Sequence, residues 1–168
     1  IRHELVHLVL TDSTVPYMPP WVAEGVAVYF GGVDLWPTIA FWLQSGQLTQ
    51  LSLADMTSQV ELGVSDPTNQ QASLQYSYAY AISAYLIETY GQETFLAFYH
   101  SYANIPLEEL MTAIPFTGDY EAAIFAWQNW ATERQVQQFF NVSLDELEEQ
   151  AETWLEAKVR VEEAEEHK

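Results

Sequence analysis

The sequence predicts a mainly α protein that folds as a single compact multi-helix domain. Its 168 residues match the size of one ordinary domain, and a hydrophobic content of 49% is ample for a packed core. Apolar residues recur at helical spacing between prolines, glycines and acidic residues that are typical of helix ends. No internal repeat or low-complexity linker divides the chain. We therefore expect one domain over residues 1–155, followed by an acidic C-terminal tail or helix end over residues 156–168.

Start and stop signals place the helices in order along the chain. Proline is harmless in the first turn of a helix, and glycine commonly ends one. Asp119 is an expected N-terminal cap, and Ser143 with Glu146 forms an expected capping box. Residues 63–69 carry a loop signature, either of a surface connection or of a lid beside a cleft. The expected helices cover residues 1–10, 20–30, 36–44, 53–58, 72–90, 92–103, 106–111, 120–140 and 143–155.

The strong acidic excess limits the classes of partner. Five basic residues against 24 acidic residues give a formal net charge of −19, which would repel nucleic acid and anionic membrane surfaces because both are polyanions. The apolar run over residues 21–30 is too short to span a bilayer and is interrupted by Glu24. We therefore expect neither nucleic-acid binding nor membrane insertion of this chain. Because it has no cysteine, a disulfide framework is excluded, and the oligomeric state is not predicted.

The residues that carry chemistry begin with the pentapeptide His3-Glu4-Leu5-Val6-His7, an HExxH pattern. Positions four apart lie on one face of a helix, so His3 and His7 can both offer a ring nitrogen to a single metal ion. Glu4 lies at the edge of that face, where its carboxylate can reach a metal-activated water rather than the metal itself. A catalytic zinc usually takes three protein ligands and keeps one position open. A third ligand is therefore expected elsewhere in the chain.

Glu24 is the candidate third ligand. It stands in an otherwise apolar helix, where an unpaired carboxylate would be costly to bury and coordination would remove that cost. The neighbouring Gly25 would let another segment of the chain approach closely. The prolines within residues 16–20 would turn the chain so that the two helices face each other.

The HELVH pentapeptide is followed after sixteen residues by Glu24, within the pattern Pro-x-Trp-x-x-Glu-Gly-x-Ala-x-Tyr of residues 19–29. This combination resembles the gluzincin metallopeptidases, most closely the peptidase MA-like group. The resemblance implies one zinc ion per chain bound by His3, His7 and Glu24, with Glu4 as the general base of peptide-bond hydrolysis through a metal-activated water. It implies a peptide or protein as the substrate. The resemblance is specific in the first thirty residues and continues through residues 76–91 and, more weakly, 140–154.

The same resemblance implies the helical catalytic part of a zincin-like fold. In zincins a small sheet commonly precedes the first zinc-binding helix. No such sheet is in this sequence, so the N-terminus is expected to be truncated. Relatives of the group are often exported or associated with the bacterial cell envelope, which favours an extracellular or envelope location.

An oxyanion donor is also implied. In gluzincins a tyrosine at the start of the helix after the zinc site hydrogen-bonds the tetrahedral oxyanion, and Tyr76 matches that position, with Tyr80 as the alternative. A phenol suits this role because it is a neutral donor whose bond strengthens as negative charge develops. His100 is another candidate donor, although a histidine in a last helical turn usually complements the terminal carbonyls. Asp12 is either a hydrogen-bond partner of a zinc-binding histidine or a loop residue.

Two alternative functions use the same residues differently. Where relatives often carry a second acidic residue four positions after the ligand glutamate, this chain has Val28. A catalytically silent zinc-binding helical module that binds a protein partner is therefore the main alternative to a metallopeptidase. A purely structural helical domain without metal is the other.

Overall fold

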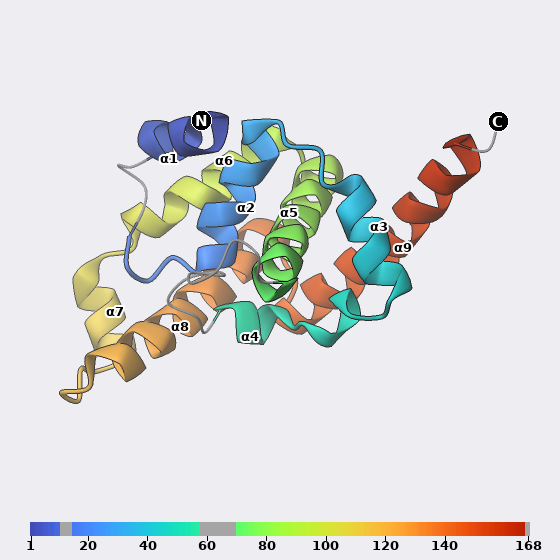
Figure 1. Ribbon diagram of the computed structural model, residues 1–168. Coiled ribbons are helices and arrows are strands. Elements are labelled where there is room, and N and C mark those ends of the chain that lie inside the picture. The colour runs from blue at the N-terminus through green and yellow to red at the C-terminus, as the bar shows by residue number, and fades with distance from the viewer. Residues whose placement is uncertain (11–14, 58–69, 167–168) are drawn as a thin grey trace.

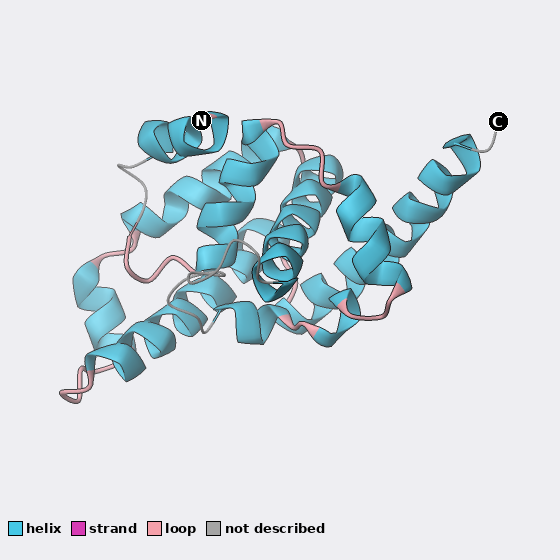
Figure 2. Cartoon of the chain, viewed as in Figure 1, coloured by secondary structure: helices cyan, strands magenta, loops and turns pink. Residues whose placement is uncertain are grey.

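The computed structural model describes residues 1–10, 15–57 and 70–166. Within these ranges all regular structure is helical and no strand is present (Figure 2). The expected mainly α fold is confirmed. Asp12 and the loop over residues 63–69 lie outside the described residues, so their expected roles stay predictions.

The helix ends fall within two residues of the expected positions, except at the end of the last helix. Two 3₁₀ helices add single turns, η2 (Leu48–Gln50) and η3 (Tyr102–Asn104). The α-helices are α1 (Arg2–Leu10), α2 (Pro20–Gly31), α3 (Trp36–Gln44), α4 (Leu53–Thr57), α5 (Gln70–Tyr90), α6 (Gln92–Ser101), α7 (Leu107–Ala113), α8 (Tyr120–Phe140) and α9 (Leu144–Glu166).

Helix α5 is the centre of the molecule. Helices α2, α3, α6 and α9 pack against it (Figure 1). Every residue from Ser77 to Ile87 is buried, which is typical of a helix surrounded on all sides. Large side chains of α2 and α6 complete this core, where Trp21, Phe95 and Phe98 are fully shielded from solvent. The helix that carries Glu24 is thus built into the core.

The N-terminal caps of α8 and α9 form as expected. Asp119 Oδ1 accepts a hydrogen bond from the Ala122 amide at 3.1 Å. In the capping box of α9, Ser143 Oγ accepts from the Glu146 amide at 3.2 Å, and Glu146 Oε2 accepts from the Ser143 amide at 2.8 Å. The hydrogen bonds from the backbone and side chain of Ser143 favour the charged carboxylate and so lower the pKa of Glu146.

A carboxylate of α9 joins three helices. Glu148 Oε1 accepts a hydrogen bond from the Tyr78 hydroxyl of α5 at 2.9 Å and another from the Leu53 amide at the start of α4 at 3.1 Å. Burial, and then the nearby charge of Glu148, raises the pKa of Tyr78 well above its ordinary value. Tyr78 therefore remains a neutral donor to this carboxylate.

Helix α9 continues without a break beyond residue 155 and extends away from the other helices (Figure 1). Val159 is buried because it continues, at four-residue spacing, the apolar stripe that includes Ala151 and Leu155. Residues 156–166 are therefore the end of the last helix.

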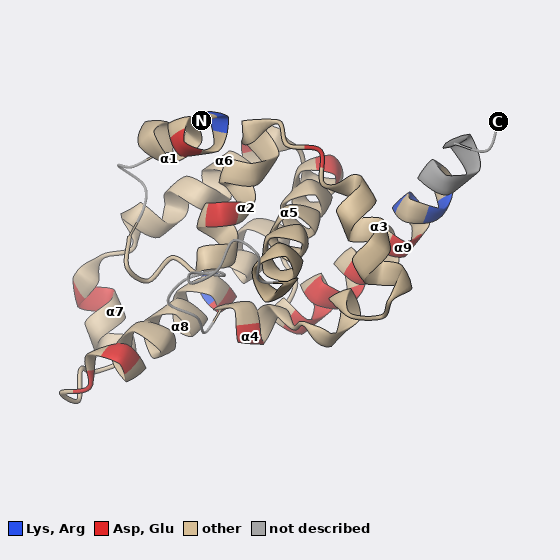
Figure 3. Ribbon diagram, viewed as in Figure 1, with Lys and Arg blue, Asp and Glu red and all other residues tan. Residues whose placement is uncertain are grey.

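Acidic residues outnumber basic residues along the described chain, and α7, α8 and α9 each carry at least two acidic residues (Figure 3). Several basic side chains are paired with them, as in Arg134 with Glu109 at 3.1 Å and Lys158 with Glu88 at 2.9 Å. Such exposed pairs contribute little to stability. Among the described residues, no helix has both the length and the apolar character needed to cross a membrane.

Gly25 brings α2 and α5 to backbone distance. A Cβ atom at this position would overlap Ser83 Oγ and lie 2.6 Å from the Ala79 carbonyl oxygen. Both neighbours belong to the central helix, and the carbonyl can move only if α5 moves. The expected close approach beside Glu24 is confirmed.

We predict that Gly25→Ala lowers the free energy of unfolding by about 1–3 kcal/mol, because overpacking the α2–α5 contact outweighs the better helix propensity of alanine. Denaturant unfolding followed by circular dichroism measures the change. Gly31→Ala is the matched comparison, because a Cβ atom there would be 3.3 Å from its nearest neighbours, and it should cost much less. Equal stability of Gly25→Ala and the unmodified protein would contradict the packing argument.

Candidate metal centre

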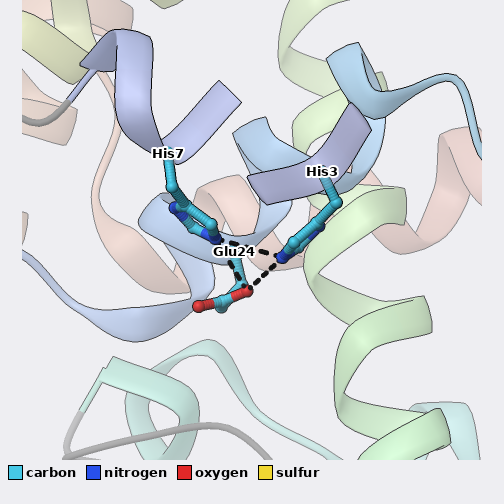
Figure 4. A group of neighbouring side chains, drawn as sticks. All are labelled: His3, His7 and Glu24. Atoms are coloured by element: carbon cyan, nitrogen blue, oxygen red, sulfur yellow. Dashed lines mark hydrogen bonds and ion pairs between the residues drawn. The ribbon is translucent and has the colours of Figure 1, made fainter. Parts of the chain in front are cut away.

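Three potential metal ligands converge between α1 and α2. The imidazoles of His3 and His7 project from α1 toward Glu24 on α2 (Figure 4). His3 Nε2 and His7 Nε2 are 3.1 Å apart, and they lie 3.2 and 3.3 Å from Glu24 Oε2. Within the described part of the chain, this is the one group of three or more such side chains that could hold a metal ion together.

Local structure explains why the two histidines meet the glutamate. The four-residue spacing puts both imidazoles on one face of α1, one turn apart, with ring centroids 4.7 Å from each other. Helix α2 begins at Pro20, which suits a first turn, and ends at Gly31, after which the C-cap residue Gly32 has a left-handed backbone with φ of 70°. Glu24 faces α1 one turn after the start of α2.

The start of α2 is anchored on two sides. Trp21 is fully buried, and its indole N–H donates to Thr57 Oγ1 at 2.9 Å across the core. In the segment before α2, the Tyr17 hydroxyl donates to the Ile105 carbonyl oxygen at 3.3 Å, and burial raises the pKa of this phenol. These contacts restrict the direction in which α2 presents its carboxylate.

The donor set fits zinc. Four ligands at 2.0–2.1 Å in a tetrahedron are about 3.3 Å apart, close to the three separations seen here. Each imidazole Nε2 carries at most one proton, so well-aligned hydrogen bonds cannot satisfy all three contacts at once, whereas a divalent cation can bind all three atoms. The side chains of His3, His7 and Glu24 are 24%, 28% and 23% exposed, so the centre is open to a water or a substrate.

Glu4 lies on α1 directly after His3 and is exposed. A helix turns by 100° per residue, so Glu4 stands on the flank of the face that carries the two histidines. It is not part of the three-residue cluster. This arrangement suits a group that acts beside a metal rather than as one of its ligands.

The two candidate tyrosines lie in different surroundings. The ring of Tyr76 is 6.3 Å from that of His3, at the edge of the cluster. The ring of Tyr80 packs instead at 5.7 Å from each of Tyr29 and Trp36, and Tyr80 is buried. Tyr76 is thus in ring contact with a histidine of the cluster.

His100, another candidate donor, is not part of the cluster, and position 28 adds no donor to it. His100 is exposed near the end of α6, where its backbone carbonyl accepts a hydrogen bond from Asn104 Nδ2 at 3.2 Å. Val28 is buried in the core, so α2 offers no carboxylate at that position.

Sequence reasoning missed two contributors to the geometry of the centre. One is the hydrogen bond between Trp21 and Thr57, which no local pattern indicates because the residues are 36 positions apart. The other is Gly31, whose missing side chain lets α1 approach. The sequence signal for this contact was the Gly31-Gly32 pair. A left-handed residue at a helix end requires only one glycine, so the other glycine needs a separate explanation.

Comparison with known proteins gives one result. The family model of the Peptidase MA superfamily matches residues 1–133, a span that includes α1, α2 and the whole cluster. Neither the curated proteins nor the solved structures include a significant match. Since the matched span covers most of the 168 residues, the chain belongs to the Peptidase MA superfamily.

Proposed function

We propose that this chain is a zinc-dependent metallopeptidase that hydrolyses peptide bonds. The observation that carries the proposal is the convergence of His3, His7 and Glu24, three donors of the kind and spacing that zinc takes, in a chain of the Peptidase MA superfamily. Membership of the superfamily by itself supports a metallopeptidase-like domain. The donor geometry supports the more specific reading.

Each side chain has a distinct role in this proposal. His3, His7 and Glu24 would hold one zinc ion. Zinc at this centre supplies a Lewis acid that polarises the scissile carbonyl and lowers the pKa of a water molecule. Glu4, on the flank of the histidine face, accepts the proton of the attacking water and returns it to the leaving nitrogen.

Tyr76 is the proposed oxyanion donor. Its phenol donates a hydrogen bond to the carbonyl oxygen as that oxygen becomes negative, and its ring contact with His3 puts it at the edge of the centre. The packing of Tyr80 between Tyr29 and Trp36 argues against the same role for that residue. The proposed substrate is a peptide or protein because the chain belongs to the Peptidase MA superfamily, and the net charge of −19 disfavours a polyanion.

A zinc-binding module without catalysis is the second candidate. It is favoured by Val28, which is buried where relatives often carry an acidic side chain near the ligands. A carboxylate at such a position orients a ligand, and without it the metal would be held less firmly. This candidate shares the metal site and differs only in turnover.

The first prediction of this proposal concerns the metal. Purified protein should contain about one zinc per chain, and His7→Ala should lose it, because two remaining ligands hold zinc far more weakly than three. Elemental analysis by mass spectrometry gives the stoichiometry. His100→Ala is the matched control, as it removes an exposed imidazole outside the cluster and should keep the metal. Absence of zinc from the unmodified protein after reconstitution would overturn the proposed function.

The second prediction concerns the general base. Glu4→Gln should keep zinc and lower kcat on a cleavable peptide by about 100-fold or more, because the amide cannot accept the proton of water. A quenched-fluorescence peptide library provides the substrate, and Glu93→Gln on α6 controls for the loss of one surface charge. Unchanged turnover would remove Glu4 from the mechanism. Stoichiometric zinc with no cleavage of any library member by the unmodified protein would favour the second candidate.

The third prediction separates the two tyrosines. Tyr76→Phe should lower kcat by about 100-fold with little change in KM, since the lost hydrogen bond forms mainly in the transition state. Tyr80→Phe keeps the aromatic packing against Tyr29 and Trp36 and should leave kcat within a few-fold of the unmodified enzyme. Steady-state kinetics on one peptide tests both variants. The reverse pattern would assign the oxyanion role to Tyr80.

A further inference from the structure

At the end of α2, Gly31 packs against the backbone of His3, one of the proposed ligands. Gly31, the last residue of α2, is buried, and a Cβ atom on it would lie 3.3 Å from both the Cα and the backbone N of His3. The third nearest atom, at 3.6 Å, is the Cβ of His3. The backbone of His3 therefore packs directly against the position where a side chain on residue 31 would begin.

Backbone conformation does not explain a glycine at position 31. The left-handed residue that ends α2 is Gly32, with φ of 70°, and Gly31 is not among the residues with positive φ. Alanine has the better helix propensity at an ordinary helical position. The side chain of an alanine at position 31 would have too little room, because the nearest atoms belong to the His3 backbone and cannot rotate away.

Gly31 and Glu24 lie on the same face of α2. They are seven residues apart, which is close to two full turns, so both face α1. The same face of α2 thus carries the proposed ligand Glu24 and, two turns later, Gly31, against which α1 packs. Because His3 and His7 belong to the same short helix, a displacement of α1 at His3 moves both imidazoles relative to Glu24.

We propose that Gly31 is a positioning residue for the metal centre. Its missing side chain sets the distance between α1 and α2, and this distance determines where His3 and His7 lie relative to Glu24. This inference rests on the proposed zinc site. A Cβ atom at 3.3 Å forces α1 to give by a few tenths of an ångström. That displacement is comparable with the tolerance of about 0.2 Å on zinc–ligand distances.

The test compares substitutions at two adjacent residues. One is expected to change zinc affinity with little effect on stability, and the other is expected to change stability with little effect on zinc affinity. Gly31→Ala should weaken the affinity for zinc about 10-fold, the lower end of the effect of residues that support ligands, with little loss of thermal stability in the metal-free protein. Gly32→Ala should lower thermal stability, because alanine is strained at φ of 70°, yet bind zinc within about twofold of the unmodified protein. Its Cβ atom would meet only the end of the Arg2 side chain, at 3.6 Å.

Zinc affinity is measured by competition with a chromophoric chelator, and circular dichroism confirms that each metal-free variant is folded. The absorption bands of the Co²⁺-substituted protein give a second readout, since they follow ligand geometry and not stability. They should change in Gly31→Ala and not in Gly32→Ala. Equal zinc affinity and equal Co²⁺ spectra of Gly31→Ala and the unmodified protein would overturn the positioning role alone. Failure of the unmodified protein to bind either ion would instead overturn the zinc site itself.

Discussion

Helix α2 approaches both of its main neighbours at backbone distance, and the candidate metal centre depends on these two contacts. Through Gly25 it lies against Ala79 and Ser83 of the central helix α5, and through Gly31 it lies against His3 of α1. The first contact fixes α2 in the core, and the second fixes α1 on α2. Glu24 directly precedes Gly25 and its carboxylate contacts His3 and His7 of α1, so its position is set by the same packing that sets the position of the imidazoles.

The centre combines an apolar helix with a polar cluster that the core alone would not favour. Glu24 is the acidic residue of a helix whose other side chains are largely buried, and burial of an unpaired carboxylate is unfavourable. The two imidazole nitrogens within 3.3 Å offset part of that cost, and a cation shared by all three donors would offset more. The sequence therefore departs from a purely apolar α2 at one position, which is where a functional residue is expected to break a local rule.

The sequence alone predicted the parts of the structure that short-range patterns encode. Helix ends follow from local signals such as Asp119 and the Ser143–Glu146 capping box, and the three donors follow from four-residue spacing plus one isolated acid. The choice between Tyr76 and Tyr80 could not be made, because residues four apart share a helix face.

Contacts between residues distant in sequence separate these tyrosines. Tyr76 contacts His3 of α1, whereas Tyr80, one turn later on α5, packs against Tyr29 and Trp36. The contact between His3 of α1 and Gly31 could not be predicted either, because it joins residues 28 positions apart. Its only trace in the sequence is a glycine that no local pattern explains.

Helix α1 is the least supported part of the centre. None of its nine residues is fully buried, and Leu5, Leu8 and Val9 are 51%, 70% and 80% exposed, so α1 is held essentially from one side. A helix shorter than about 12 residues is marginal by itself, and its order therefore depends on its contacts with α2. A metal ion ligated by both helices would add a bond between α1 and the core. Metal binding and the ordering of α1 would then be one coupled equilibrium, in which part of the binding energy would hold the helix that carries His3 and His7.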